Sequence, residues 1–527
     1  MVKVHFTILL FFLTFYSLGQ EVLLPLGNRF KDSYSIGVET KMHNGLLPAT
    51  KTNIYGASLN QSLKEEGSWL NRKLFKEHFI ILEGEDYFFT IDPLVDLSLG
   101  LETGKDTNRL FQNTRAFQVQ GEILGKVSFF SSFQENQARF ANYRADFYAD
   151  RGEQRINQQS LNYDTINAVV PNGGRTKDFK EDGYDYAASL GYVRYRVNDA
   201  LAVQIGNQQS FIGHGFRSML LADNSFYANT LRVDTNPFEK WQYTTMHSQH
   251  LNLFRRIRAL GDTVFVTSVE EPYERKNFSA KYLTYNPLEN LSIGLFEAQV
   301  YFREDSIQSQ WMHPLFFNPL PFLNTLVYGF ENEHAKSLLG VNAAWRMNPN
   351  HLFYGQFVAD ETNAESFGYQ IGWRSLYQLN NAKILLQLEH NQAGSQLYAA
   401  NNRRLAFTHF NLPLAHLLGN GFQEYVLRSR LYLGKMYAEL EGVFYERNRS
   451  ITDMRGLFDN RGVHPEAAQS VLFVSGEMGF EMNPVTKLSV FGRASLRSVD
   501  FNLARDASNF IIELGIQTNI FNRHLAF

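Results

Sequence analysis

The sequence predicts an all-β fold, a large antiparallel transmembrane β-barrel of about 16–18 strands with a small N-terminal helical segment. Three observations support this prediction. Apolar and polar residues alternate over long stretches, these stretches exceed the usual strand length of soluble domains, and short turns alternate with long polar connections along much of the chain. In such a barrel only every second residue of a spanning strand faces lipid, which accounts for an ordinary hydrophobic content of 44 %.

The alternation is clearest beyond residue 330. Every second residue from Leu339 to Met347 is apolar, and Asn342 and Arg346 are among the residues between them. The same period of two recurs in segments 369–374, 425–433, 488–497 and 510–517. Many of these stretches run to about 10–14 residues, whereas a tilted strand needs ~9–11 residues to cross a bilayer. These segments are therefore long enough to span a membrane.

The connections between these stretches fall into two classes. The short ones carry Asn, Asp or Pro, which favour turns, and they include 197–199, 286–290, 347–350, 379–381 and 482–484. The long, polar ones are Glu135–Gly183, Phe211–Glu239, Arg303–Lys336, Ala393–Gly421 and Arg447–Gln469. Tight turns at one end and long loops at the other are typical of outer-membrane barrels, whereas a soluble β-sandwich, the alternative fold, has no reason to sort its loops.

The composition fits this fold and excludes several others. Aromatic residues reach 14 %, with 45 Phe and 26 Tyr, as expected of a barrel with aromatic girdles. The mean hydropathy of −0.29 is too polar for a bundle of membrane helices. The net charge of −3 argues against a nucleic-acid partner, and the absence of Cys excludes disulfides and thiolate metal sites. We predict no cofactor and no metal.

The first residues resemble an export signal. An apolar run from Phe6 to Tyr16 is followed by small residues at Ser17 and Gly19, which predicts a signal peptide over 1–19 that is cleaved before Gln20. Residues 20–85 do not alternate like strands, and the pattern around 68–79 predicts a short amphipathic helix. We expect this segment on the periplasmic side or folded into the lumen, with a simple tether as the alternative, and the barrel over 86–527.

The alternation also places a set of arginines on the face opposite lipid. They are predicted to point into the lumen, where guanidinium groups suit the carboxylates and hydroxyls of a glycan. The alternative is that Glu389, Glu439, Glu441 and Glu513 pair with them and fill the lumen. The candidate glycan-contact residues are Arg346, Arg374, Arg428, Arg430, Arg493 and Arg497.

Other chemistry finds little support in the sequence. His247 and His250 are three residues apart, so a strand places them on opposite faces and prevents a shared metal ion. Adjacent Glu389 and His390 likewise diverge, and no Ser–His–carboxylate set emerges, so we predict a protein that is not an enzyme. The aromatic stretch 311–322 is too apolar for a free loop. It is expected to fold into the barrel mouth or lie against a partner, with contact to a glycan as a further alternative.

Two stretches resemble a known family. Residues 71–78 (Asn-Arg-Lys-Leu-Phe-Lys-Glu-His) resemble a segment of Bacteroidota outer-membrane proteins, and residues 212–224 resemble a Gly-x-Gly-x-Arg-Ser-Leu-Leu-Leu-Ser-Asp block. Both belong to the capsule-assembly Wzi-like family, which includes the gliding-motility RemB-like branch. Lys76 and Ala222 depart from its pattern, which has Asn and Ser there. The motif residues are Gly213, Gly215, Arg217, Ser218, Asp223 and Asn224, and Arg217 is predicted to pair with Asp223.

This resemblance implies a monomeric barrel without catalytic residues. It implies attachment or assembly of surface polysaccharide (capsule), or a part in gliding motility and adhesion. The expected partners are outer-membrane lipid, surface polysaccharide and motility or secretion machinery, with no nucleic acid. The alternatives are an outer-membrane porin and, with less support, an outer-membrane hydrolase.

Overall fold

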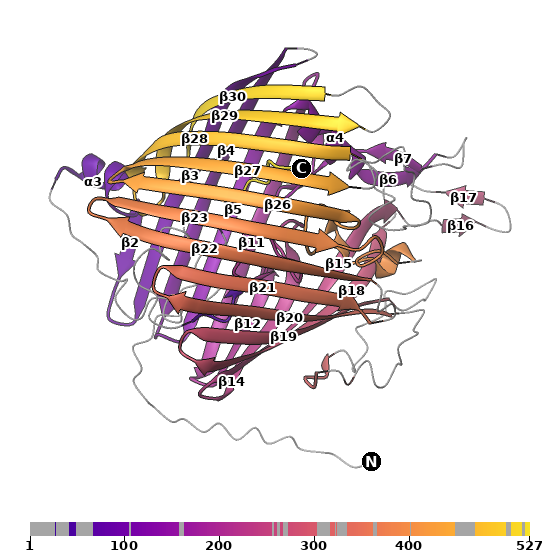
Figure 1. Cartoon of the computed structure of the whole chain (residues 1–527), viewed down its shortest axis with the longest axis horizontal. Coiled ribbons are helices and arrows are strands. Elements are labelled where there is room, and N and C mark those ends of the chain that lie inside the picture. The colour runs from indigo at the N-terminus through magenta and orange to yellow at the C-terminus, as the bar shows by residue number, and fades with distance from the viewer. Residues whose placement is uncertain are drawn as a thin grey trace.

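A computed structural model describes residues 42–48, 67–104, 107–157, 163–255, 258–260, 264–266, 272–302, 317–321, 335–361, 366–400, 402–447, 469–501, 507–518 and 522–527, and the single residues 27 and 323. The predicted signal peptide, 1–19, and most of the 311–322 stretch lie outside these residues. Figure 1 shows long strands wound around a common axis. The prediction of a large antiparallel barrel is confirmed, and the number of strands, 18, is at the upper end of the predicted range.

Each of the 18 strands pairs with the next along the chain, and β3 pairs with β30 to close the cylinder from Asp96–Gln517 to Thr103–Phe510. Closure gives the backbone N–H and C=O groups of β3 and β30 hydrogen-bond partners. Strands in lipid require such partners, because no water is available to bind these groups. The barrel strands are β3 (Tyr87–Thr103), β4 (Asn108–Ile123), β5 (Val127–Arg139), β11 (Gly183–Asn198), β12 (Leu201–Gln208), β14 (Ala228–Phe238), β15 (Trp241–Arg255), β18 (Tyr273–Leu288), β19 (Leu291–Tyr301), β20 (Ala335–Asn348), β21 (His351–Asp360), β22 (Phe367–Leu379), β23 (Ala382–Ala393), β26 (Phe422–Leu433), β27 (Met436–Arg447), β28 (Gln469–Asn483), β29 (Leu488–Phe501) and β30 (Ala507–Gln517).

The two ends of the barrel differ as predicted. Two-residue turns join β11 to β12, β20 to β21, β22 to β23 and β26 to β27 at one end, which we call the turn end. At the other end, the loop end, lie the helix α4 (Asn142–Asp150) and the short strands β6 (Glu153–Ile156), β7 (Tyr163–Ile166), β10 (Lys177–Phe179), β16 (Arg258–Leu260) and β17 (Val264–Val266). One predicted boundary is wrong, because β14 lies inside the stretch that we assigned to a loop, Phe211–Glu239.

The outer wall is apolar. Large hydrophobic side chains are exposed on the outward positions of strands all around the cylinder. Exposure of so much apolar surface is unfavourable in water and favourable in contact with acyl chains. Among the most exposed are Leu99, Ile205, Ile371, Met478 and Leu514. Among the described residues, none of the helices has the length and apolar character needed to cross a membrane.

Several segments between the strands fold back into the lumen. Residues 42–48 form β1 (Leu46–Leu47), which pairs with β13 (Phe211–Ile212). Residues 213–227, residues 394–421 and the tail 522–527 pack beside them, and together these segments form what we call the plug. The stretch 394–421 contains η3 (Arg403–Leu405), β24 (Thr408–His409) and β25 (Leu412–Pro413). Burial of Leu46, Ile212, Leu220, Leu412 and Phe527 gives the barrel an apolar core. The described residues of 211–227 and 394–421, which we predicted to belong to outer loops, therefore lie inside.

Residues 67–104 include α3 (Trp69–Phe75), where the sequence predicts a helix, and β2 (Ile80–Glu83), which pairs with β3. The Ser68 side chain caps α3 by accepting the N–H of Asn71. The amide of Asn483, at the end of β28, donates to the main-chain oxygens of Lys73 and Glu77. These bonds hold α3 at the turn end of the barrel (Figure 1).

One described segment lies against the outer wall. Lys281 and Glu297 face each other in the β18–β19 register and form an ion pair of 3.3 Å with side chains 3 % and 2 % exposed. They point outward, because neighbouring Tyr282 reaches inward to the main-chain oxygen of Asn44. Residues 317–321, which we call the strap, cover this pair through a bond from Lys281 Nζ to the main-chain oxygen of Leu320, 2.9 Å long.

The strap corrects one expectation. The ring of Phe317 lies 5.0 Å from that of His247, and the Tyr243 hydroxyl donates to the main-chain oxygen of Pro319. The described part of the 311–322 stretch thus covers polar groups on the barrel exterior and does not enter the mouth. Its Phe317 and Leu320 are 45 % and 59 % exposed, so an apolar surface replaces the polar one.

Candidate functional site

The sequence motif lies in the plug, in the segment that follows β13. The Ser218 hydroxyl donates to the main-chain oxygen of Ile212 and accepts the N–H groups of Leu220 and Leu221, each at 3.2 Å. The side-chain oxygen of Gln356, on β21, accepts the N–H of Met219 at 2.7 Å. These bonds satisfy a tight backbone turn deep in the barrel, where water cannot replace a missing partner.

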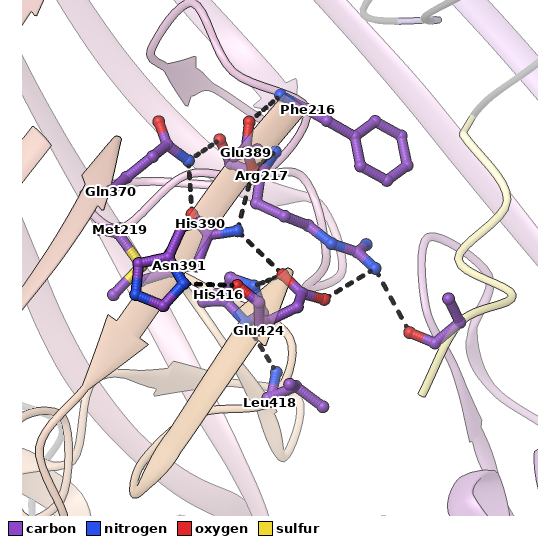
Figure 2. Close-up of polar contacts among 12 residues, drawn as sticks. Phe216, Arg217, Met219, Gln370, Glu389, His390, Asn391, His416, Leu418 and Glu424 are labelled. Carbon is purple, nitrogen blue, oxygen red and sulfur yellow. Dashed lines mark hydrogen bonds and ion pairs between the residues drawn. The ribbon is translucent and has the colours of Figure 1, made fainter. Parts of the chain in front are cut away.

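The barrel wall holds the motif through Glu389. This β23 carboxylate accepts the main-chain N–H groups of Phe216 and Arg217 at 2.8 and 3.0 Å (Figure 2). It also accepts the hydroxyl of Tyr354 at 2.9 Å. On β22, the amide of Gln370 donates to the main-chain oxygen of Arg217 at 2.9 Å. Glu389 was predicted as a partner for lumen arginines, but its oxygens instead bind the backbone of the plug.

Two glycines make this approach possible. A Cβ at Gly215 would lie 2.5 Å from Glu389 Oε2 and 2.8 Å from the main-chain oxygen of Arg217. A Cβ at Gly213 would lie 2.6 Å from the Gln356 amide nitrogen, and Gly213 has a φ of +145°. Both positions therefore exclude side chains because the plug backbone lies against the wall.

The Arg217 side chain connects three parts of the molecule. Its guanidinium lies 3.4 Å from the Glu424 carboxylate of β26 and donates to the main-chain oxygen of Ala526 at 3.3 Å. His416 accepts the N–H of Leu418 on Nδ1, so its Nε2 carries the proton that it donates to Glu424 at 2.7 Å. Figure 2 shows Glu424 between Arg217 and His416. The predicted pairing of Arg217 with Asp223 is wrong.

The last two motif residues fasten the plug segments to one another. The Asp223 carboxylate accepts the side-chain amide of Asn522 at 2.7 Å, which ties the motif to the tail. The Asn224 amide donates to the main-chain oxygen of Ala415, which ties it to the 394–421 stretch. All six motif residues therefore have contacts that stabilise the plug, and each polar side chain among them has a protein partner.

The predicted lumen arginines do point inward, and three of the six have carboxylate partners among the described residues. Arg428 and Arg430 both reach Glu439, at 3.2 and 2.5 Å. Arg493 pairs with Glu477 and with Glu513 at 3.1 Å, as the ion-pair interpretation predicts for Glu513. Glu441 lies beside Arg428 in the strand register. Arg497 Nε donates to the main-chain oxygen of Phe527 at 2.8 Å.

Two arginines of the set differ from the others. Arg374 is buried on β22, and among the described residues it has no hydrogen-bond or ion-pair partner. Arg346 is half-buried near the turn end, where its N–H donates to the main-chain oxygen of Asn290. Strand register puts Leu352 between them, so these two arginines occupy one row of the inner wall. Contact of the six arginines with a glycan stays a prediction.

A second polar cluster lies at the loop end and was not predicted. Arg403 forms an ion pair of 2.6 Å with Glu274, and its guanidinium lies 4.3 Å from the ring of Phe254. Its Nη2 donates to the Tyr163 hydroxyl at 3.1 Å, and the Tyr163 ring is 36 % exposed. Arg404 adds a second guanidinium 3.7 Å from Glu274. We call Tyr163, Phe254, Glu274, Arg403 and Arg404 the mouth cluster.

The two histidine predictions agree with the geometry. His247 faces outward beneath the strap, whereas the His250 ring faces inward and stacks on His409 at 4.6 Å. Glu389 faces the plug, and the adjacent His390 faces the outer wall. Within the described part of the chain, no group of three or more His, Asp or Glu side chains is placed to hold a metal ion.

Comparison with known proteins relates this fold to outer-membrane barrels. No protein-family model matches the chain, and no curated sequence matches it. Among solved structures, Wzi of Escherichia coli matches with a TM-score of 0.51 and 10 % identity, over 93 % of this chain and 98 % of that chain. That protein is described as an outer-membrane protein involved in group 1 capsule assembly and as a carbohydrate-binding β-barrel.

Two further matches come from other bacteria, and the first is described as an outer-membrane protein. OpdK of Pseudomonas aeruginosa has a TM-score of 0.41 and 10 % identity, over 82 % of this chain and 98 % of that chain. OccAB1 of Acinetobacter baumannii has a TM-score of 0.42 and 10 % identity, over 85 % and 99 %. The likeness to Wzi shows the fold, a large antiparallel β-barrel that this chain shares with an outer-membrane protein.

Proposed function

We propose that this chain is a non-enzymatic outer-membrane barrel that attaches or organises cell-surface polysaccharide, in the manner of the Wzi-like family. The observation that carries the proposal is the plug. Four segments of the chain occupy the lumen and bind the wall through Glu389, Gln356 and Glu424. Such bonds suit a rigid support for a binding surface better than a solute pathway.

The mouth cluster is the surface that we assign to the glycan. Sugar rings stack on exposed aromatic rings, and guanidinium groups bind carboxylates and hydroxyls. Tyr163 offers a ring at the loop end, and Arg403 and Arg404, with side chains 34 % exposed, lie beside it. Arg374, a buried arginine whose side chain has no hydrogen bond or ion pair among the described residues, is the lumen position that we propose for a glycan acid group.

A binding assay tests this assignment. Purified barrel is applied to an array of acidic and neutral polysaccharides, with Y163A, R404Q and R374Q beside the wild type. The control is R139Q, because Arg139 forms an exposed ion pair with Asp182 at the same end. We expect retention of an acidic glycan by the wild type and R139Q and at least tenfold weaker retention by Y163A, R404Q and R374Q. No retention by the wild type would contradict the proposal.

A cellular test addresses the capsule and motility roles together. The resemblance to the capsule-assembly family and its RemB-like branch supports both. Deletion of the gene should alter capsule retention or colony spreading, and fractionation should find the mature chain in the outer membrane after removal of residues 1–19. Unchanged capsule and unchanged spreading would contradict the proposal.

A selective channel is the second candidate. The inward positions of β20–β23 carry polar residues such as Asn342, Gln370 and Gln387, a composition typical of water-filled barrels. Planar-bilayer recording distinguishes the two functions. The plug predicts a silent barrel, and steady conductance by the wild-type protein would favour the channel.

A further inference from the structure

The outer wall contains a groove that the polysaccharide proposal does not use. It lies across strands β21, β22, β23, β26, β27 and β28, which form the near wall of the barrel in Figure 1. Its volume of about 580 Å³ is within the ~300–1,000 Å³ of sites for small ligands. Ile371 and Trp373 line one side, and Tyr425, Leu427 and Phe444 line the other. Gly442, which follows Leu427 in the strand register, is an outward position without a side chain.

Strand register arranges the surface around the groove in three rows. Nearest the loop end is a polar row of Tyr369, Gln392, Gln423 and Glu446. The next row contains Ile371, His390, Tyr425 and Phe444, and the third contains Trp373, Leu388, Leu427 and Gly442. The wall therefore changes from polar to apolar along the strand direction, as the membrane does from its headgroups to its acyl chains.

His390 is a polar group within this otherwise apolar wall. Its Nδ1 lies 3.1 Å from the main-chain oxygen of Glu424, so Nδ1 carries the proton and Nε2 is an acceptor. The Tyr369 hydroxyl lies 3.3 Å from Nε2, but the same hydroxyl donates to the Gln392 side-chain oxygen at 3.0 Å. Tyr369 has a single proton, and when that proton lies in the shorter bond to Gln392, Nε2 can accept a bond from a ligand.

The occupant of the groove follows from its position. The groove is continuous with the exposed apolar wall, where Ile371 is 64 % and Leu388 48 % exposed. Among the described residues that line it, none points a charged side chain into the groove, because the carboxylate of Glu389 binds the plug. An acyl chain can pack against such an apolar surface, and a hydrogen-bond donor at the head of that chain can donate to His390 Nε2.

We propose that this groove binds one outer-leaflet lipid, with an acyl chain along Gly442 and a hydroxyl or amide N–H of the lipid donating to His390 Nε2. The polar row of Tyr369, Gln392 and Gln423 then lies at the level of the headgroup. This site is independent of glycan binding, since none of its residues belongs to the plug or to the mouth cluster.

Two glycine substitutions test the groove. A Cβ at Gly442 meets only Leu427 Cβ, at 3.9 Å, and one at Gly476 meets nothing within 4 Å, so G442L and G476L should both fold. G442L fills the groove, whereas G476L adds the same side chain to the neighbouring strand and serves as control. Circular dichroism first establishes that each variant has the strand content of the wild type.

Native mass spectrometry of the barrel in detergent measures lipid occupancy. The probes are ceramide phosphoethanolamine and diacyl phosphatidylethanolamine, which share a headgroup but differ in hydroxyl and amide donors. We expect the wild type and G476L to prefer the ceramide lipid and G442L to bind it at least tenfold more weakly. H390F should bind both lipids equally. Equal lipid occupancy in G442L and the wild type would contradict lipid binding in the groove. Equal binding of both lipids by the wild type would contradict the hydrogen bond to His390.

Discussion

The guanidinium of Arg217 lies 3.4 Å from the carboxylate of Glu424, and both side chains are buried inside the barrel. The pair joins a segment between strands to a spanning strand 207 positions further along the chain. Because Glu424 also accepts bonds from His416 and Asn391, one carboxylate holds two segments of the plug against the wall. The plug is therefore fastened at a small number of charged positions.

Loss of this pair should loosen the plug. R217M leaves Glu424 with one positive partner fewer in a buried setting, which typically costs about 3–5 kcal/mol. We expect a lower urea midpoint, cleavage of 394–421 by added protease, and conductance in planar bilayers. E446Q is the control, because Glu446 is on the outward face of β27. An R217M barrel as closed and as stable as the wild type would show that the plug is held elsewhere.

A side chain at Gly215 should have a related effect by steric means. G215V places carbon atoms on the Glu389 carboxylate, which a Cβ already approaches to 2.5 Å. Overpacking of this kind costs ~1–3 kcal/mol, and here it also breaks the bonds from Phe216 and Arg217. Heat-modified migration on gels and urea unfolding measure the loss. G476A should behave like the wild type, because Gly476 has open space around it.

Acid should weaken the plug through His409. Its Nδ1 accepts the N–H of Leu251 at 3.0 Å and its Nε2 donates to the main-chain oxygen of Tyr227. Protonation of Nδ1 would therefore break the bond from Leu251. Burial lowers the pKa of His409 to about 3, against 6.5 for an unperturbed histidine. Burial and the nearby Arg232 lower the pKa of His43, in the same plug, to about 4.

The sign of this effect follows from proton uptake. Between pH 6.5 and the lowered pKa values of His409 and His43, these histidines are protonated in the unfolded state and neutral in the folded state. The free energy of unfolding therefore falls as the pH falls. We expect protease cleavage of the plug to increase between pH 7 and pH 4.5, while the strand signal in circular dichroism persists. H409Q should show a smaller change over the same interval. An identical pH response in H409Q and the wild type would exclude His409 as the cause.

Lys281 and Glu297 on the outer wall permit a paired test. K281M removes the Lys281 ammonium from the Glu297 carboxylate, which stays buried beneath the strap, and a broken buried pair costs about 3–5 kcal/mol. The double variant K281M/E297L makes the wall apolar and should recover most of that loss. Urea midpoints in detergent measure both. If the double variant is no more stable than K281M, the strap does not act by shielding this pair.

Much of the barrel can be predicted from the sequence because its causes are local. Alternation assigns one face of each strand to lipid, and it correctly places Arg428, Arg493 and Glu389 on the inner face. The short turns follow from Asn and Pro at defined positions. The plug could not be predicted in the same way, because the partners of Arg217 and Glu389 lie more than 150 positions apart along the chain.

A signal for the plug is nevertheless present in the sequence. Several inward positions of regularly alternating strands carry polar side chains, and buried side chains of this kind form hydrogen bonds with groups in the lumen. These residues are Gln356, Gln370, Asn391 and Glu424. Apolar residues in the 394–421 stretch, such as Leu412 and Leu417, also argue against an outer loop. The strap is harder to foresee, because it depends on outward charges at Lys281 and Glu297 that conflict with a lipid-facing wall.

The tail after β30 has a consequence for biogenesis. Residues 522–527 lie inside the cylinder, where Phe527 packs 4.2 Å from Phe147 and the oxygen of Ala526 meets Arg217. The seam between β3 and β30 joins strands from opposite ends of the chain, and a finished cylinder offers no side entrance. The tail and the inner segments therefore enter the lumen either before this seam forms or afterwards through an end of the barrel, which links packing of the interior to closure of the wall.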